Sequence, residues 1–593
     1  MPWYNVLVPP TMKQTIQNET SSLQWHDYII IGIVLLISAS IGIYYRFTGG
    51  QQRTTEEYFS ANRSMKILPL GIAMTVSFIS AITILGISAE IYVHGMMLIV
   101  LTIGFLIGTP IAMYFYLPVF FELKVISVFE YIERRFGIKV RLLASVANFC
   151  HMILHTGIVL YAPSIALEAT TGLSSTLSII LIGVICTFYS TIGGIKAVLI
   201  SDVFQGLLMF LSTLCVIGIG SSILPNGIYD VWDRAIRGDR INLNVFTLDL
   251  TIRHTWWGLL FGGICMFLTL FAVGQVQVQR LLTVKNLRAS QMALILSSVI
   301  MFTLIMTTSF SGLVMYAVYM DCDPMKSGKI SSSDKLMPYF VIDKLSYIPC
   351  FTGLFISGVF SASLSTISAM LNSLAALAIE DYIKPIYSKI GATFPKEKAT
   401  LLGKLLAVLN GIFCVSIALI AGKLGSLIEA VIGLVGIIGG PLLGIFTFGM
   451  FFESANEIGA IVGMIFTVIT LGFISYGSKV TVTTLPVSID GCENETLLML
   501  NETIGLNSTI SNNSNVPYIN RISYTWYPVI GMLLTIIVGY LTSLITNNCI
   551  GNTREYDPNL FTPFIAARIK KRRQNEQRVT SSQMFVLEPS YRK

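Results

Sequence analysis

The sequence contains few charged residues, and this scarcity excludes an ordinary soluble domain. Only 12% of the 593 residues are Asp, Glu, Lys or Arg, against about 25% in a typical globular domain. Hydrophobic residues make up 53% of the chain, and the mean hydropathy is +0.72. The formal charge of +7 does not indicate a nucleic-acid partner, because the basic residues lie between apolar runs and in the C-terminal tail. A membrane protein is predicted.

Motifs for metal, redox and hydrolytic chemistry are also missing. The nine cysteines form no CxxC pair, and most fall inside apolar runs, where they pack as small hydrophobic side chains. The chain has no HExxH, no paired catalytic aspartates and no Gly-x-Ser-x-Gly elbow. We therefore expect a protein that is not an enzyme and needs no organic cofactor.

Long apolar runs dominate what remains. Each is long enough for a helix to cross a hydrocarbon core of about 30 Å. We predict about 13 transmembrane helices, near residues 25–45, 66–93, 95–120, 141–167, 175–192, 200–224, 254–276, 290–320, 346–379, 400–421, 424–451, 457–477 and 525–547. The fold class is therefore an all-α polytopic membrane protein.

Charge and sequons predict the orientation. With the N-terminus outside, 27 of the 39 Lys and Arg residues lie on the cytoplasmic side. We expect an extracellular segment over 1–24, a transmembrane domain over 25–547 with an outer loop near 478–524, and a cytoplasmic basic tail over 548–593 of a plasma-membrane protein. Glycosylation acceptors fall outside in this topology, at Asn18, Asn494, Asn501, Asn507 and Asn512.

Two further features concern the loops and the tail. Cys322 and Cys492 lie in long exterior loops, where an oxidising environment allows a disulfide. The tail carries a basic cluster that is typical either of a solvated segment or of one attracted to anionic lipid: Arg568, Lys570, Lys571, Arg572 and Arg573. No obligate protein partner is evident.

Two spans carry clusters of oxygen-bearing groups. In the second, residues 71–86 contain hydroxyl side chains, and unwinding there would free carbonyls at mid-membrane to line a cavity or bind an ion. In the ninth, the Ala362 carbonyl and the Ser365 and Thr366 hydroxyls share one helical face at i, i+3 and i+4. Such oxygens suit Na⁺. The alternatives are a small-residue packing face and serines bonded to their own helix.

Ionisable residues within the spans are also candidates, because a charge in the bilayer is costly. They are Glu90 in span two, Asp202 at the start of span six, and His151 and His155 one turn apart in span four. The structural alternatives are an interfacial Asp202 satisfied by backbone amides and a hydrogen-bonded interior His155.

Several segments in order resemble the sodium/solute symporter family from about residue 25 to 550. They are Tyr58-Phe59 with Arg63-Ser-Met65, Phe129-Glu-Tyr-Ile-Glu-Arg-Arg-Phe-Gly137, Tyr189-Ser-Thr-Ile-Gly193-Gly194, Asp202-Val-Phe-Gln205, Gln275-Val-Gln-Val-Gln279-Arg280 and the serine-rich span nine. The resemblance implies a leucine transporter-like fold, with a five-plus-five inverted repeat over 66–224 and 254–451. It also implies Na⁺ as the coupling ion and symport of a small solute by alternating access.

Carried over to this chain, the family's sodium site would use the carbonyls of Val76, Ile79 and Ala362 and the hydroxyls of Ser365 and Thr366. Asp202 would lie on the inner exit path. The same face of span nine follows from helical spacing alone.

The resemblance also bears on the substrate. Sugar-transporting members have a histidine, aromatic gates and an aspartate where this chain has Thr83, Leu270 with Phe271, and Gly274, which disfavours sugar. Residues 82–92 and 156–163 look like the branch that carries monocarboxylates, vitamins and iodide, although His155 stands where that branch has tyrosine. We expect a small organic anion, with iodide, inositol, sugar or a solute-sensing receptor as alternatives. The expected substrate-binding residues are Ser80, Thr83, His155, Phe271 and Gln275.

Overall fold

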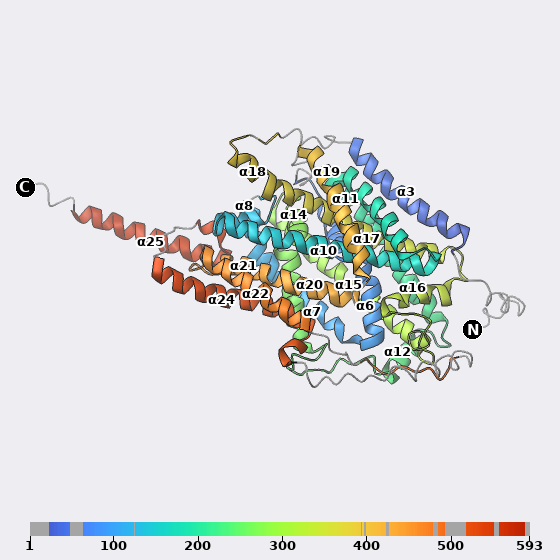
Figure 1. Ribbon diagram of the computed structural model, residues 1–593. Helices are drawn as coiled ribbons and strands as arrows, with labels where there is room; N and C mark the ends of the chain where they lie inside the picture. Colours follow the sequence, from blue (N-terminus) through green and yellow to red (C-terminus); the bar gives the residue numbers. More distant parts are fainter. Residues whose placement is uncertain are drawn as a thin grey trace, which may run out of the picture.

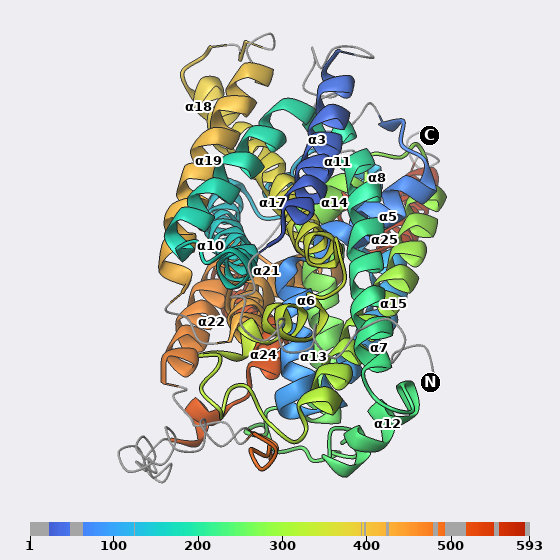
Figure 2. The same ribbon diagram turned by 90° about the vertical axis from the view of Figure 1, so that its right-hand side faces the viewer.

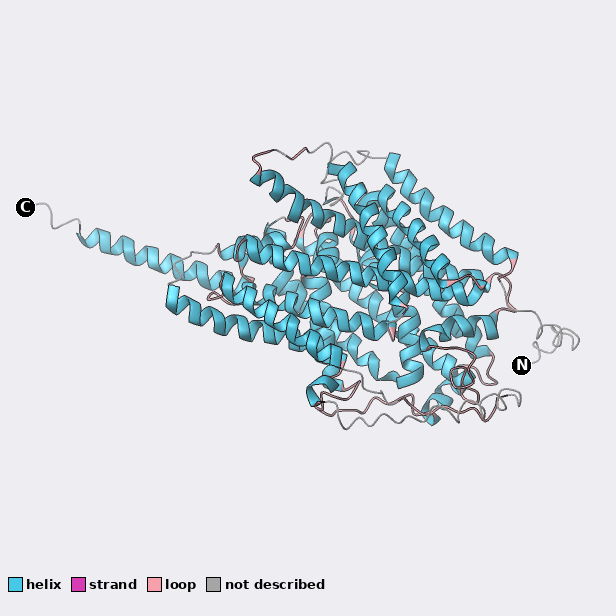
Figure 3. Cartoon of the chain, viewed as in Figure 1, coloured by secondary structure: helices cyan, strands magenta, loops and turns pink. Residues whose placement is uncertain are grey.

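The computed structural model describes residues 23–47, 63–123, 125–392, 394–395, 399–422, 426–477, 484–492, 517–550 and 557–587. This part of the chain is helical and contains no strand (Figure 3). The five predicted glycosylation sites lie outside the described residues. The all-α prediction is confirmed.

The chain forms a series of helices. The principal ones are α3 (Trp25–Phe47), α5 (Ile67–Phe78), α6 (Ala81–His94), α7 (Val100–Ile111), α8 (Leu117–Leu123), α9 (Phe129–Arg135), α10 (Ile138–Thr171), α11 (Ser175–Ser222), α12 (Ile228–Arg237), α13 (Trp256–Phe267), α14 (Gln275–Leu281), α15 (Leu287–Tyr319), α16 (Leu336–Phe340), α17 (Phe351–Leu377), α18 (Lys384–Lys389), α19 (Ala399–Ala421), α20 (Leu427–Leu434), α21 (Gly440–Phe451), α22 (Glu457–Gly477), α24 (Tyr527–Ile550) and α25 (Pro563–Leu587).

Ten helices among the described residues are long and apolar enough to span a membrane, or up to twelve when each of two bent pairs counts as one span. The predicted span at 175–192 corresponds to a shorter apolar stretch, Ser175–Phe188, within the continuous helix α11. The count of thirteen therefore stays a prediction. Loops and α12 gather at one end of the bundle, and α18 and the C-terminal end of α3 lie at the other (Figure 2).

Both bent pairs begin a predicted repeat. Helices α5 and α6 meet at 59°, and α13 with its π-helical extension Leu268–Ala272 meets α14 at 58°. The first break was predicted. The second was not, because the predicted span ended at residue 276, whereas the helix resumes and continues to Leu281. Gly274 is required there, since a Cβ would lie 2.3 Å from the Leu270 carbonyl oxygen.

Helix α17 forms the centre of the bundle. It packs against α3, α5, α10 and α11, and nearly all of its residues are buried (Figure 1). Because α17 contacts both the broken helix α5 and the long helix α10, its polar residues lie deep inside the protein. This position explains why a helix rich in serine is tolerated in an apolar bundle.

Polar contacts close the end of the bundle near α12. Cys322 and Cys492 form a disulfide, with their Cα atoms 5.0 Å apart. The buried Arg240 guanidinium donates to the carbonyl oxygens of Tyr92 and Pro486 and lies 4.0 Å from the centre of the Tyr316 ring. These contacts join three loops that are distant in sequence. At the C-terminal end of the chain, α25 projects from the bundle (Figure 1).

Asp334, in the loop between α15 and α17, holds the start of α20 by accepting a hydrogen bond from the Leu427 backbone N–H at 3.3 Å. Burial raises the pKa of this carboxyl from 3.8 to about 6. The folded state therefore binds the proton more tightly than the unfolded state and loses stability as the pH rises from about 4 to about 6.

We expect Asp334→Asn to raise the thermal midpoint of the purified protein at pH 7.5, because the amide keeps an acceptor for Leu427 without a buried charge. The gain is at most about 3 kcal/mol, from about 1.4 kcal/mol per pKa unit, and it should vanish near pH 4. Thermal unfolding at a series of pH values measures this difference. A variant that is less stable than the wild type at pH 7.5 would contradict it.

Candidate functional site

The break between α5 and α6 leaves backbone groups free inside the bundle. Ile79 and Ser80 are extended, and Ser80 caps α6 in a reciprocal arrangement with Thr83. The Ser80 N–H donates to Thr83 Oγ1 at 3.3 Å, whereas in an unbroken helix it would donate to the Val76 carbonyl. The capping therefore stabilises the broken conformation and releases the Val76 oxygen.

Helix α17 presents its hydroxyls to this released carbonyl. Ser365 Oγ donates to the carbonyl oxygens of Val76 and Ala362, each at 3.0 Å. Thr366 Oγ1 donates to the Ala362 oxygen at 3.1 Å. The bonds to Ala362 are the self-bonding expected of helical serines, but the bond to Val76 crosses to another helix. Four of the five predicted sodium-binding residues thus meet, with Ile79 in the adjacent break.

These groups are neutral oxygens, and all five residues are buried. Hard cations bind oxygen ligands of this kind. Unwound backbone at mid-membrane is found where it lines a cavity or coordinates an ion. The arrangement can therefore hold a small monovalent cation between the broken helix and α17, provided that the hydroxyls turn their lone pairs toward it.

Asp202 lies in α11 and is fully buried. Its Oδ2 forms an ion pair with the Arg280 guanidinium of α14 at 2.8 Å, so backbone amides are not its partners. Arg280 also donates to the Ala73 carbonyl of α5 at 2.9 Å. These contacts join α11 to α5, the first half of one broken span, and to α14, the second half of the other. Sequence reasoning missed this arginine because it lies beyond the predicted end of span seven.

A cavity lies beside the breaks. Four of the residues predicted to bind substrate, Ser80, Thr83, His155 and Gln275, line it, and their contact with a substrate stays a prediction. Phe271 does not line it. It is buried behind Phe78, with ring centroids 5.5 Å apart, and stacks on Phe267 at 4.6 Å. The prediction of Phe271 as a contact residue is therefore wrong for this cavity, and its ring instead supports Phe78, which does line it.

Gln275 has both ends of its amide engaged. Nε2 donates to the Ile126 carbonyl and Oε1 accepts from the Val128 N–H, each at 2.9 Å. Between these two residues, Ser127 Oγ donates to Asp381 Oδ2 at 3.0 Å. Gln275 therefore clamps the 126–128 loop against α14, and its amide is not free for a substrate.

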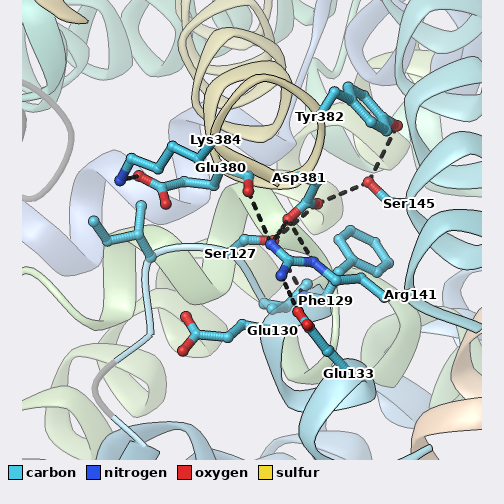
Figure 4. Close-up of polar contacts among 12 residues, drawn as sticks. Ser127, Phe129, Glu130, Glu133, Arg141, Ser145, Glu380, Asp381, Tyr382 and Lys384 are labelled. Atoms are coloured by element: carbon cyan, nitrogen blue, oxygen red, sulfur yellow. Dashed lines mark hydrogen bonds and ion pairs between the residues drawn. The ribbon is translucent and has the colours of Figure 1, made fainter. Parts of the chain in front are cut away.

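Asp381 is the centre of a buried polar network at this end of the bundle (Figure 4). Arg141 donates to it at 2.5 Å and also pairs with Glu133. Ser145 Oγ donates to Asp381 Oδ2 at 2.7 Å. The network joins α9, α10 and the π-helical segment Ala378–Ile383 that follows α17, so the loop held by Gln275 is anchored on both sides.

A second network lies at the opposite end of the cavity. Arg253 donates to Glu90 of α6 at 2.7 Å and to Glu429 of α20 at 2.9 Å. His254 Nε2 lies 2.9 Å from the Tyr524 hydroxyl and 3.4 Å from Glu90 Oε1. Glu90 was a sequence candidate. Arg253 was not a candidate, because no sequence pattern indicates that it contacts carboxylates as distant in the chain as Glu90 and Glu429.

Known proteins resemble this chain over most of its length. It is 43% identical over 558 residues to a Drosophila melanogaster protein provisionally named a sodium-dependent multivitamin transporter, with 92% of each chain covered. It is 35% identical to the human sodium-coupled monocarboxylate transporter 1, covering 90% of this chain and 88% of that one. The rabbit (Oryctolagus cuniculus) sodium-dependent multivitamin transporter is also 35% identical, with 93% and 86% covered.

The fold matches a solved structure of a Na⁺-coupled sialic acid symporter, with a TM-score of 0.71 at 22% identity, covering 88% of this chain and 98% of that chain. The predicted leucine transporter-like fold is thereby confirmed. A profile of the sodium:solute symporter family matches residues 58–467. The chain is a multi-pass, sodium-coupled symporter, and it belongs to the sodium:solute symporter family.

Proposed function

We propose that this symporter imports a small organic anion, a monocarboxylate or a vitamin-like carboxylate, across the plasma membrane by alternating access. The observation that carries the proposal is the bond from Ser365 Oγ to the Val76 carbonyl, beside the cavity. Na⁺ would bind the oxygens of Val76, Ile79, Ala362, Ser365 and Thr366. The N-terminus would be extracellular and the tail cytoplasmic.

Among the described residues, none of those that line the cavity carries a charged side chain. An anion there would need compensation from the positive N-terminal end of α6, from hydroxyls and from co-transported ions. Arg280 cannot provide it, because its charge is already paired with Asp202. Relatives named for monocarboxylates and vitamins support this substrate class.

We propose further that more than one Na⁺ accompanies each anion. One Na⁺ with a monovalent anion moves no net charge, so a tenfold sodium gradient supports only about tenfold accumulation. A second Na⁺ adds another factor of about ten. It also adds a net positive charge, which contributes roughly 1.4 kcal/mol at about 60 mV, or about another tenfold. Electrogenic coupling would therefore allow efficient scavenging.

Voltage-clamped cells that express the protein should show an inward current when lactate, pyruvate or biotin is added in sodium medium. Replacement of sodium by choline should abolish the current, and uninjected cells provide the control. Iodide, myo-inositol and glucose complete the panel. Uptake confined to neutral sugars would refute the anion proposal, and uptake unaffected by choline would refute the sodium site.

A further inference from the structure

Four polar atoms that border the cavity have no hydrogen-bond partner among the described residues. They are His151 Nε2, His155 Nδ1, Gln277 Oε1 and Ser309 Oγ. His151, Gln277 and Ser309 are each at least nine-tenths buried. Buried polar groups are nearly always satisfied, because an unmade hydrogen bond costs about 1–3 kcal/mol. Four such atoms on one cavity indicate that a bound molecule supplies the missing partners.

The four atoms come from two sides of the cavity. His151 and His155 lie one turn apart on α10, with ring centroids 6.0 Å apart. Gln277 belongs to α14, and Ser309 belongs to α15. Helix α6, which also lines the cavity, packs against α10 and against α15. The histidines and Ser309 therefore flank α6 from different neighbouring helices.

The two sides offer different chemistry. A neutral imidazole can donate one N–H, and two imidazoles side by side can donate to the two oxygens of a carboxylate. Gln277 presents an acceptor to the cavity rather than a donor. Its Nε2 donates to Ser77 Oγ at 3.1 Å and to the Met74 carbonyl at 3.4 Å, which fixes Oε1 as a free acceptor. An acceptor in this position requires a donor from the substrate.

Resting on the anion symport proposed above, we infer that His151 and His155 bind the substrate carboxylate, while Gln277 and Ser309 bind a second, hydrogen-bond-donating group. Preferred substrates are thus carboxylates that also carry a hydroxyl or an amide N–H. The apolar lining between the two sides, including Ile82 and Phe78, accommodates the hydrocarbon that joins these groups.

Matched acids test the donor requirement. The pairs are lactate with propionate, which differ by one hydroxyl, and an N-acyl-β-alanine with the unbranched fatty acid of equal length. Because a site built to bond a donor rejects an analogue that lacks it, at least one donor acid should have a KM about tenfold or more below that of its partner. Ser309→Ala should reduce the ratio between the KM values of the acid without a donor and the acid with one. Equal KM values within both pairs, as expected of a cavity filled only by water, would overturn the inference.

Histidine variants test the carboxylate end. His151→Met and His155→Met should each raise the KM for carboxylates about tenfold or more, with the sodium dependence unchanged, because each removes a hydrogen bond to a charged group. His151→Gln should recover part of the affinity, since its amide keeps a donor. Asn410→Leu is the matched control. Asn410 in α19 is also buried with an unpartnered nitrogen, but it does not line the cavity.

The two proposals fail differently. Absence of sodium-dependent uptake of any acid by the wild type would refute anion symport, and the histidine assignment with it. Normal uptake by the wild type, with unchanged KM in surface-expressed His151→Met and His155→Met, would refute only the assignment.

Discussion

Replacement of Ser365 and Thr366 together by alanine is expected to weaken sodium activation of uptake at least about a hundredfold, while the protein still reaches the cell surface. Both hydroxyls lie on the face of α17 that meets the broken helix, and Ser365 contacts the Val76 carbonyl. Each lost bond to a charged group is worth about 1.5–3 kcal/mol, so two lost ligands account for this factor. Uptake measured over a range of sodium concentrations gives the effect.

Ser363→Ala is the matched control for this double variant. Ser363 is equally buried in the same helix, but its hydroxyl points to the Val159 carbonyl of α10, at 3.5 Å. We expect its sodium activation to remain close to that of the wild type. If the double variant and the control behaved alike at equal surface expression, the sodium site would have to lie elsewhere.

Local spacing explains why the sodium-site face could be predicted from the sequence. Residues at i, i+3 and i+4 share a face in any helix, so the sequence alone predicts that Ala362, Ser365 and Thr366 lie together. The hydroxyl residues of span two are compatible with a break or with a small-residue packing face, and the family resemblance implied the break between α5 and α6. Which carbonyl this face meets is a tertiary fact, and the family resemblance supplied it.

Other features depended on contacts that no local pattern encodes. The second break follows from the close approach of Gly274 to the Leu270 carbonyl, whereas the sequence shows only a glycine before a polar run. Phe271 was placed in the pocket by its position in the motif, but stacking on Phe267 turns it away. Gln275, predicted to bind substrate, lines the cavity, but its amide is used by the 126–128 loop.

Arg280→Met should strongly reduce the amount of folded protein. It would leave the Asp202 carboxylate buried without a countercharge, and removal of one partner from a buried ion pair costs about 3–5 kcal/mol. Asp202 Oδ1 already lacks a hydrogen-bond partner among the described residues, so nothing there would replace the arginine. Thermal unfolding in detergent and surface expression measure the loss.

The double variant Asp202→Asn with Arg280→Met separates stability from transport. With the buried charge removed, most of the lost stability should return, because a neutral pair of similar volume can replace a buried ion pair. If Asp202 also lies on the path by which Na⁺ leaves, as the family resemblance implies, the restored protein should still transport slowly, since the acidic ligand is missing. Recovery of both stability and transport would show that the ion pair serves only to hold α5, α11 and α14 in place. Recovery of neither would show that the hydrogen bond from Arg280 to the Ala73 carbonyl contributes more than the charge of Arg280.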